Sequence, residues 1–288
     1  WTHRLGGINF MGRGTVTARA ALLADGRRGD RVITLAEGHG YAVGDRITVV
    51  APATERFRRL IEHHMSWHTL AQGLFEVVEV EGGRVTLSQP LRTDFLREDG
   101  AFAQKMRLIT GCGVEGVGYE QASSIERAPG MKEADYKRAR LAEDLPFYGV
   151  FFQNAWGVWL RDVGVRDAGF HTAYFVVTKH AEVRDCVFED RRFPGGGATS
   201  YAGFDRTWDG LMENLETHNL RHAPNLQWNA SGNVIRNGRF TGSDGQWHAG
   251  WTLENLLENN VISAHGTGGT YGHGLYASGP WSPLHGPQ

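Results

Sequence analysis

The second half of the chain repeats one short pattern of hydrophobic and polar positions. Each copy has an apolar residue, a charged Arg or Glu, an Asp or Asn and then a second apolar residue, in WLRDVGV (159–165), EVRDCVF (182–188), LMENLET (211–217), VIRNGRF (234–240) and LLENNVI (256–262). The shared position falls at Asp162, Asp185, Asn214, Asn237 and Asn259, in steps of 23, 29, 23 and 22 residues. The long step contains the loop PGGGATS (194–200), and two further steps towards the N-terminus lead to Gly116. Self-similarity at a nearly fixed spacing is the signature of a repeat architecture.

This spacing excludes several familiar repeats. Tetratricopeptide and ankyrin units are longer and helical, and the regular leucine pattern of leucine-rich repeats is missing. A parallel β-solenoid remains, in which each coil stacks on the next. Asp and Asn suit its sharp turns because they tolerate left-handed backbone, and copies stacked ~4.8 Å apart can hydrogen-bond one another. The register predicts two inward columns, which are Leu160, Val183, Met212, Ile235 and Leu257, and Val165, Phe188, Thr217, Phe240 and Ile262.

The first hundred residues alternate in the manner of β-strands instead. Two strand-like runs lie within 31–50, and residues 74–91 predict a hairpin that turns at Gly82 and Gly83. Apolar residues at helical spacing predict a short helix within 54–71. We therefore divide the chain into a β-rich N-terminal module (1–105), leaving open whether it includes the first coil, and a β-helix (106–288). A charged, helical excursion is expected at 125–146.

Composition and charge exclude several classes of function and structure. The 30 Lys and Arg nearly balance 32 Asp and Glu, for a net charge of −2. This argues against nucleic-acid and anionic-membrane partners, which favour basic surfaces. Two cysteines, Cys112 and Cys186, are too few for a disulfide framework. No apolar run reaches the ~18 residues of a membrane span. Glycine, 39 of 288 residues, indicates many tight turns or close approaches.

The coils, the NNVI-type turn (259–262) and the β-rich leading module resemble the right-handed parallel β-helix proteins of the pectate-lyase-like superfamily. The resemblance covers roughly residues 106–280 and rests on the repeat. It implies secreted or periplasmic work on acidic polysaccharides, as carried out by lyases, hydrolases, epimerases and phage tailspike depolymerases. It does not select among these activities, because one fold hosts many chemistries.

The segments before the Asp/Asn turns are rich in side chains that a solvent-facing sheet does not need for stability. We expect them to line a groove in which a polysaccharide lyase acts by β-elimination. An arginine would neutralise the uronate carboxylate, and an imidazole would exchange the protons. The candidate catalytic residues are His222, His248, Arg221, Arg206, Lys179 and Tyr201. The candidate substrate-binding residues are Trp228, Trp247, Asn225, Asp205, His171 and Trp251.

Two alternatives stay open. An inverting glycoside hydrolase would need two carboxylates. Asp209 and Glu254 share one register two coils apart, roughly 9.5 Å by strand spacing, and Asp205 could replace Glu254. The segment YGHGLYASG (271–279) resembles the G-H-G segment of polygalacturonases, although their N-T-D and D-D motifs are missing. The other alternative is a non-catalytic, glycan-binding or tailspike-like solenoid.

Motifs for cofactors are weak. GCGVEG (111–116) matches a dinucleotide fingerprint but precedes a strand-like run, whereas that site requires a helix. His64 and His68 in EHHMSWH (62–68) lack a third ligand for a metal. We therefore expect no resident metal or cofactor. Calcium binding stays open because carboxylates are numerous. The oligomeric state also stays open. The pectate-lyase R-x-P-x-x-R motif is missing.

Overall fold

A computed structural model describes residues 7–60, 71–121, 129–130, 132, 135, 148–190, 201–247 and 252–263. Most of the predicted excursion (125–146) and the segments 62–68 and 271–279 lie outside these residues. Within them the protein is almost entirely β-structure, apart from α1 (Glu55–Leu60) and the single turn η1 (Arg97–Asp99). No helix in the described part of the chain is long and apolar enough to cross a membrane. One large parallel sheet and one antiparallel sheet account for the strands.

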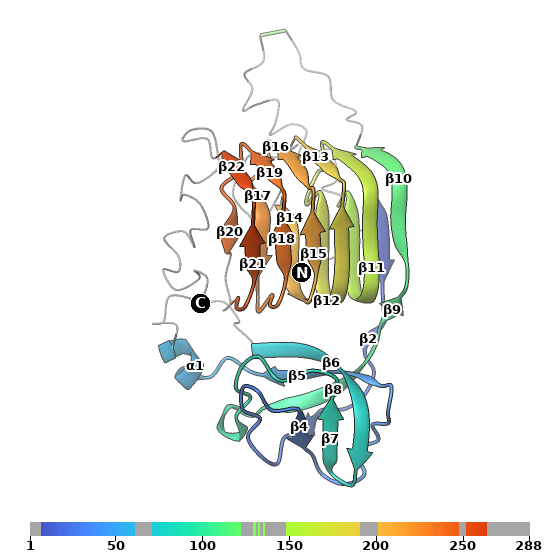
Figure 1. Cartoon of the computed structure of the whole chain (residues 1–288), viewed down its shortest axis with the longest axis vertical. Coiled ribbons are helices and arrows are strands. Elements are labelled where there is room, and N and C mark those ends of the chain that lie inside the picture. Colours follow the sequence, from blue (N-terminus) through green and yellow to red (C-terminus); the bar gives the residue numbers. More distant parts are fainter. Residues whose placement is uncertain are drawn as a thin grey trace.

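The parallel sheet curls into stacked coils (Figure 1). β11 (Val150–Arg166) runs through one whole coil, and β12 (Ala173–Arg184) with β13 (Val187–Glu189) forms the next. Three shorter strands make each later coil. These are β14 (Tyr201–Trp208), β15 (Leu211–Glu213) and β16 (Glu216–His218), then β17 (His222–Gln227), β18 (Val234–Arg236) and β19 (Arg239–Thr241), then β20 (Gln246–Trp247), β21 (Leu256–Glu258) and β22 (Val261–Ser263). The predicted parallel β-helix is confirmed.

Each coil presents three faces. Face 1 holds β14, β17, β20 and the first parts of β11 and β12. Face 2 holds β15, β18, β21 and the later parts of β11 and β12. Face 3 holds the end of β11 with β13, β16, β19 and β22. Face 1 carries the candidate residues described below.

The Asp/Asn residues form the predicted file at the corner between faces 2 and 3. All five have left-handed backbone, with φ between 50° and 55°, and Gly116 continues the file at 63°. Their amides also bond from coil to coil. Asn214 Nδ2 donates to Asp185 Oδ1, and Asn259 Nδ2 donates to Asn237 Oδ1, both at 2.8 Å. The turn file and the side-chain ladder that the repeat predicts are therefore present.

A second left-handed file, which the sequence reading missed, lies five residues further on. Asp167, Asp190 and Asn219 have φ of 53°, 56° and 56°, and Gly242 continues the file at 72°. Asn219 Nδ2 donates to Asp190 Oδ1 at 3.1 Å. These residues turn the chain from face 3 into face 1 of the next coil. The three-residue strands between the two files explain why a five-residue spacing recurs.

The predicted inward columns pair in register. Leu160 aligns with Val183, Met212, Ile235 and Leu257. Val165 aligns with Phe188, Thr217, Phe240 and Ile262. Under face 1 an aromatic stack adds to this core, with ring centroids 4.7 Å apart between Phe10 and Phe152 and 5.1 Å apart between Phe152 and Phe175. Like side chains on adjacent rungs thus fill the solenoid interior.

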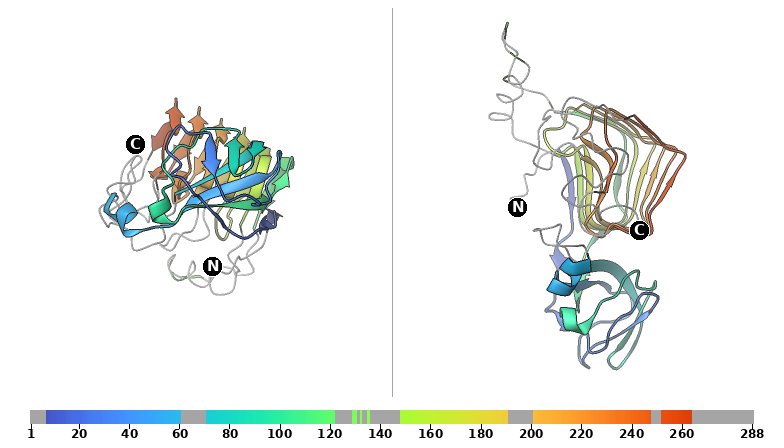
Figure 2. Two further views of the ribbon diagram at one scale, coloured as in Figure 1. Left: turned by 90° about the horizontal axis from the view of Figure 1, so that it is seen from below. Right: turned by 90° about the vertical axis from the view of Figure 1, so that its left-hand side faces the viewer.

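The N-terminal module is an antiparallel sheet of seven strands. They are β2 (Gly14–Thr15), β3 (Ala20–Ala21), β4 (Val32–Thr34), β5 (Arg46–Ala51), β6 (Ala71–Glu81), β7 (Arg84–Leu87) and β8 (Phe102–Arg107). β6 and β7 form the predicted hairpin, and α1 lies within the segment predicted as helical. The module lies along one side of the coils, not beyond an end of the stack (Figures 1 and 2).

The first coil is built from two separate segments. β1 (Ile8–Met11) pairs in parallel with the start of β11, whereas β9 (Ile109–Thr110) and β10 (Gly113–Glu120) pair with the rest of that strand. The module is therefore inserted into this coil between β1 and β9. At the same level, the next coil turns at Asn154. Asn154 Nδ2 donates to the Gly12 carbonyl at 3.3 Å. A side chain at Gly12 would collide with the Asn154 carbonyl.

The turn file gives a direct test at Asn237, which is exposed and has a φ of 55°. Replacing it with valine removes the ladder acceptor and forces a β-branched residue into the left-handed region, so we expect a loss of about 2–4 kcal/mol. Asn237→Gly keeps the backbone freedom and should cost only about 1 kcal/mol. Urea unfolding of both variants measures the difference. Equal losses would contradict a backbone requirement.

Candidate functional site

The outward side of face 1 gathers polar and aromatic side chains from successive coils. Strand alternation sends Phe152, Phe175 and Phe204 inward and their neighbours outward. The register aligns Tyr201 with His222, Gly203 with Asn225, and Asp205 with Gln227, and Asn225 aligns in turn with Gln246. We name the outward group the face 1 cluster. It comprises His171, Tyr174, Tyr201, Asp205, Arg206, Arg221, His222, Asn225, Gln227, Asp244 and Gln246. All of these residues except the half-buried Arg206 are buried.

His222 and Asp244 form a buried pair in this cluster. His222 Nδ1 lies 2.7 Å from Asp244 Oδ1, and each side chain is 1% exposed. A carboxylate at Nδ1 accepts the proton on that nitrogen and fixes the ring orientation. The neutral ring then has Nε2 as its basic nitrogen, which is the arrangement of a general base. Asp244 was missed by the sequence reading, although it lies two residues before an outward strand position.

Tyr201 lies between two imidazoles. Its ring centroid is 4.5 Å from that of His171 and 4.6 Å from that of His222. The Tyr201 backbone N–H donates to His171 Nδ1 at 3.1 Å. Arg221 Nη1 donates to the Tyr201 hydroxyl oxygen at 3.5 Å. Four residues predicted for the site thus lie together, with a cation, a phenol and two imidazoles in contact.

A second polar group lies further along the same strands. The Tyr174 hydroxyl donates to Asp205 Oδ2 at 3.2 Å, and Gln227 Nε2 donates to the same oxygen at 3.2 Å. Arg206 Nε donates to Asp205 Oδ1 at 2.7 Å. Burial raises the pKa of Tyr174 well above its ordinary value, and the Asp205 charge adds to the effect. Tyr174 therefore stays protonated as a donor to Asp205.

Three predicted residues lie elsewhere. Trp247 aligns with Leu226, an inward position, and its side chain packs in the core, so the prediction that it stacks on a sugar from outside is wrong. Trp228 packs against the core of the N-terminal module. Lys179 lies at the contact between the β-helix and the module. His248 and Trp251 are outside the described residues.

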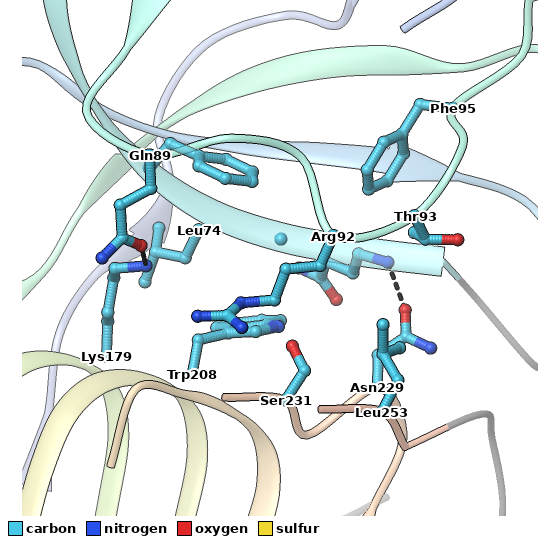
Figure 3. A pocket seen from close by; sticks show the side chains of 13 residues that line it. Leu74, Gln89, Arg92, Thr93, Phe95, Lys179, Trp208, Asn229, Ser231 and Leu253 are labelled. Atoms are coloured by element: carbon cyan, nitrogen blue, oxygen red, sulfur yellow. Dashed lines mark hydrogen bonds between the residues drawn. The ribbon is translucent and has the colours of Figure 1, made fainter. Parts of the chain in front are cut away.

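Lys179 belongs to an ionic joint that fastens the module to the coils (Figure 3). Its Nζ lies 2.6 Å from Asp209 Oδ2 and donates to Gln89 Oε1 at 2.7 Å. Burial lowers the pKa of Lys179, while Asp209 opposes that shift. Arg92 pairs with Asp209 and, at 2.7 Å, with Glu254. The cavity at the joint measures about 20 Å³, which holds about one water molecule and no sugar.

The two carboxylates considered for hydrolysis, Asp209 and Glu254, both belong to this joint. Asp209 and Glu254 do share one file of left-handed turns, with φ of 55° and 53°, and Gly232 lies between them at 68°. A side chain at Gly232 would collide with Arg92. The Arg92 guanidinium therefore lies against Gly232 and forms an ion pair with each of the two carboxylates. An inverting hydrolase needs a protonated acid and a space for water between its carboxylates, so this pair does not fit that mechanism.

The glycine motif at 111–116 has a structural explanation. Gly111 and Gly116 take left-handed turns, with φ of 59° and 63°. Gly113 begins β10, and a side chain there would collide with Trp159 of the next coil. The motif thus leads into a strand that pairs with β11. Among the side chains in the described ranges, no group of three His, Cys, Asp or Glu residues is gathered as a metal site requires.

Arg92 gives a test of the joint. Arg92→Gln leaves Asp209 and Glu254 without their shared cation, so we expect a loss of about 1–3 kcal/mol at about 0.1 M salt. The loss should shrink at about 1 M salt, where the Debye length falls to about 3 Å. The control is Arg84→Gln, which changes an exposed arginine of the same module. Urea unfolding at both salt concentrations checks this, and a loss no larger than the control's would refute the role of the joint.

Comparisons with known proteins bear on the fold. No family model and no curated protein matches the chain. It is similar to the tailspike protein gp49 from Pseudomonas phage LKA1, with a TM-score of 0.51 and 13% identity over 88% of this chain and 42% of that one. It is also similar to the Pseudomonas phage phi297 tailspike gp61, with a TM-score of 0.48 and 14% identity over 88% of this chain and 47% of that one.

A third solved structure is the Gp54 tailspike of Acinetobacter baumannii bacteriophage AP22 in complex with a capsular saccharide. Its TM-score is 0.32 and its identity 11%, over 90% of this chain and 62% of that one. The chain therefore spans less than two thirds of the length of each tailspike. The likeness to gp49 concerns the fold alone. The chain is a right-handed parallel β-helix, as its resemblance to such proteins implies.

Proposed function

We propose that this chain processes an acidic polysaccharide by β-elimination and that residues of the face 1 cluster carry the chemistry. The observation that carries this proposal is the buried His222–Asp244 pair beside the Arg221–Tyr201 contact. Elimination needs a base for the C5 proton, a cation for the uronate carboxylate and a donor for the leaving oxygen. These four residues supply the three groups within one patch.

His222 is the base in this proposal. Its Nε2 takes the C5 proton, and the electron pair of the broken C–H bond forms the C4–C5 double bond. Asp244, at 2.7 Å from Nδ1, keeps the ring oriented and stabilises the imidazolium that results. A neutral imidazole is suited to this step because its unprotonated ring nitrogen can accept a proton.

Arg221 and Tyr201 act on the substrate at the same time. The Arg221 guanidinium binds the uronate carboxylate and favours the negative charge that develops at C5. As the C4–O bond breaks, the Tyr201 hydroxyl gives its proton to the leaving oxygen. Arg221 lies 3.5 Å from that hydroxyl and favours the phenolate that forms. His171 orders the Tyr201 backbone by its hydrogen bond.

The fold supports a polymeric substrate, because stacked coils offer long, continuous surfaces, and a phage tailspike shares it. Such a substrate lies outside cells, so we propose secretion or a periplasmic location. The deep burial of His222 and Asp244 favours a second candidate, a glycan-binding solenoid without turnover. An activity assay separates the two.

The test is incubation with alginate, pectin and glycosaminoglycans, followed by the absorbance of unsaturated uronates. We expect the parent protein to raise this absorbance on at least one polymer. His222→Gln keeps a donor to Asp244 but removes the base, and should lower turnover by about 10²–10⁴-fold. His218→Gln, on face 3, is the matched control and should keep parent activity.

Other outcomes assign other functions. New reducing ends without the absorbance would indicate hydrolysis. Binding of a polymer without either product would favour the glycan-binding solenoid. Full activity of His222→Gln would refute the assignment of the base.

A further inference from the structure

We infer that Asn225 and Gln246 form a subsite next to His222. This subsite binds uncharged hydroxyl groups on a sugar ring. The inference rests on one part of the proposed function, namely that face 1 binds a glycan. It adds the chemical class that this part of the face recognises, which is adjacent, unsubstituted ring hydroxyls.

Both amides are buried without hydrogen-bond partners. Asn225 is 0% exposed and Gln246 1%, and the two residues pair across adjacent coils on the outward side of face 1. For the side chains that the structure describes, neither the amide nitrogen nor the amide oxygen of either residue has a partner. Gln227, in the next outward position of β17, has an unpartnered Oε1 as well. Five polar atoms thus lie together without partners.

The same solenoid satisfies its structural amides. Asn233 is also 0% exposed, and its Nδ2 donates to the Thr207 carbonyl and to Asn255 Oδ1, both at 2.9 Å. Its Oδ1 accepts from the Gly210 N–H at 2.8 Å. Because buried amides in proteins are almost always hydrogen-bonded, Asn225 and Gln246 stand apart from the turn residues of their own coils.

The local geometry makes room for Asn225. Gly203 is the residue that pairs with Asn225 on the preceding coil. A side chain at Gly203 would meet Asn225 Cβ at 2.7 Å. The strand register shifts between Tyr201 and Gly203, so that Asn225 follows His222 by three residues and still faces outward. The amides consequently lie beside the His222–Asp244 pair on the same face.

An amide is matched to neighbouring hydroxyls. It presents two donors and an acceptor in one plane, and each sugar hydroxyl both donates and accepts. One amide therefore bonds two adjacent ring hydroxyls, and two amides stacked about 4.8 Å apart extend the contact along the ring. Because both amides are uncharged, this subsite selects for hydroxyl pattern, whereas Arg221 selects for the carboxylate.

The experiment uses the near-isosteric variants Asn225→Leu and Gln246→Met and their double variant. Titration calorimetry with alginate, pectin and chondroitin oligosaccharides measures binding. We expect each single variant to weaken the best of these ligands at least tenfold. The urea unfolding midpoint should stay equal or rise, because each change removes an unpartnered buried amide. Gln104→Met, in β8 of the module, is the control and should bind as the parent does.

Parent-like binding by the double variant would overturn the inference and show that the amides enclose water only. Failure of the parent to bind any of the three ligands would overturn it as well. The proposed lyase activity is judged separately, by the absorbance assay with His222→Gln. A protein that binds through the amides and eliminates nothing would keep this subsite and lose the proposed chemistry.

Discussion

Parallel stacking of the coils in one register is the constraint on which the rest of the structure depends. Each coil must change direction at the same corners as its neighbours, which requires residues that accept left-handed backbone there. The Asp, Asn and Gly files meet that requirement and bond from coil to coil. Once the corners are fixed, strand alternation determines which side chains fill the core and which face outward. The face 1 cluster is a product of this arrangement.

Polar groups in this protein serve two different ends. At the joint, Arg92 of the module pairs with carboxylates from separate coils, and Lys179 of the β-helix pairs with one of them, so that the module and the β-helix are held by paired charges. On face 1, an imidazole, a carboxylate and an arginine are withdrawn from water, where each electrostatic interaction is stronger than at an exposed surface. Burial of unpartnered amides costs free energy. A glycan that bonds them would recover that cost.

The sequence repeat predicted the left-handed file at Asp162, Asp185, Asn214, Asn237 and Asn259 and both inward columns, because a solenoid translates period directly into alignment. It also brought His222, Arg221 and Tyr201 into one group. It assigned Trp247 to the wrong side of face 1, because the register shift in β17 decides which side of face 1 each residue occupies. Asp244 and Arg92 act through contacts between coils or with the module, and no local pattern predicts such contacts.

The insertion of the module into the first coil also constrains the order of folding. Ile8 pairs with Val150, so the coil that contains β1 closes only after the entire module and the start of β11 have been synthesised. Nascent chains therefore carry β1 without its partner until β11 has been synthesised, and the entropic cost of closing this long loop falls once the module between the two segments has become compact. Formation of this coil is thus a long-range event in folding.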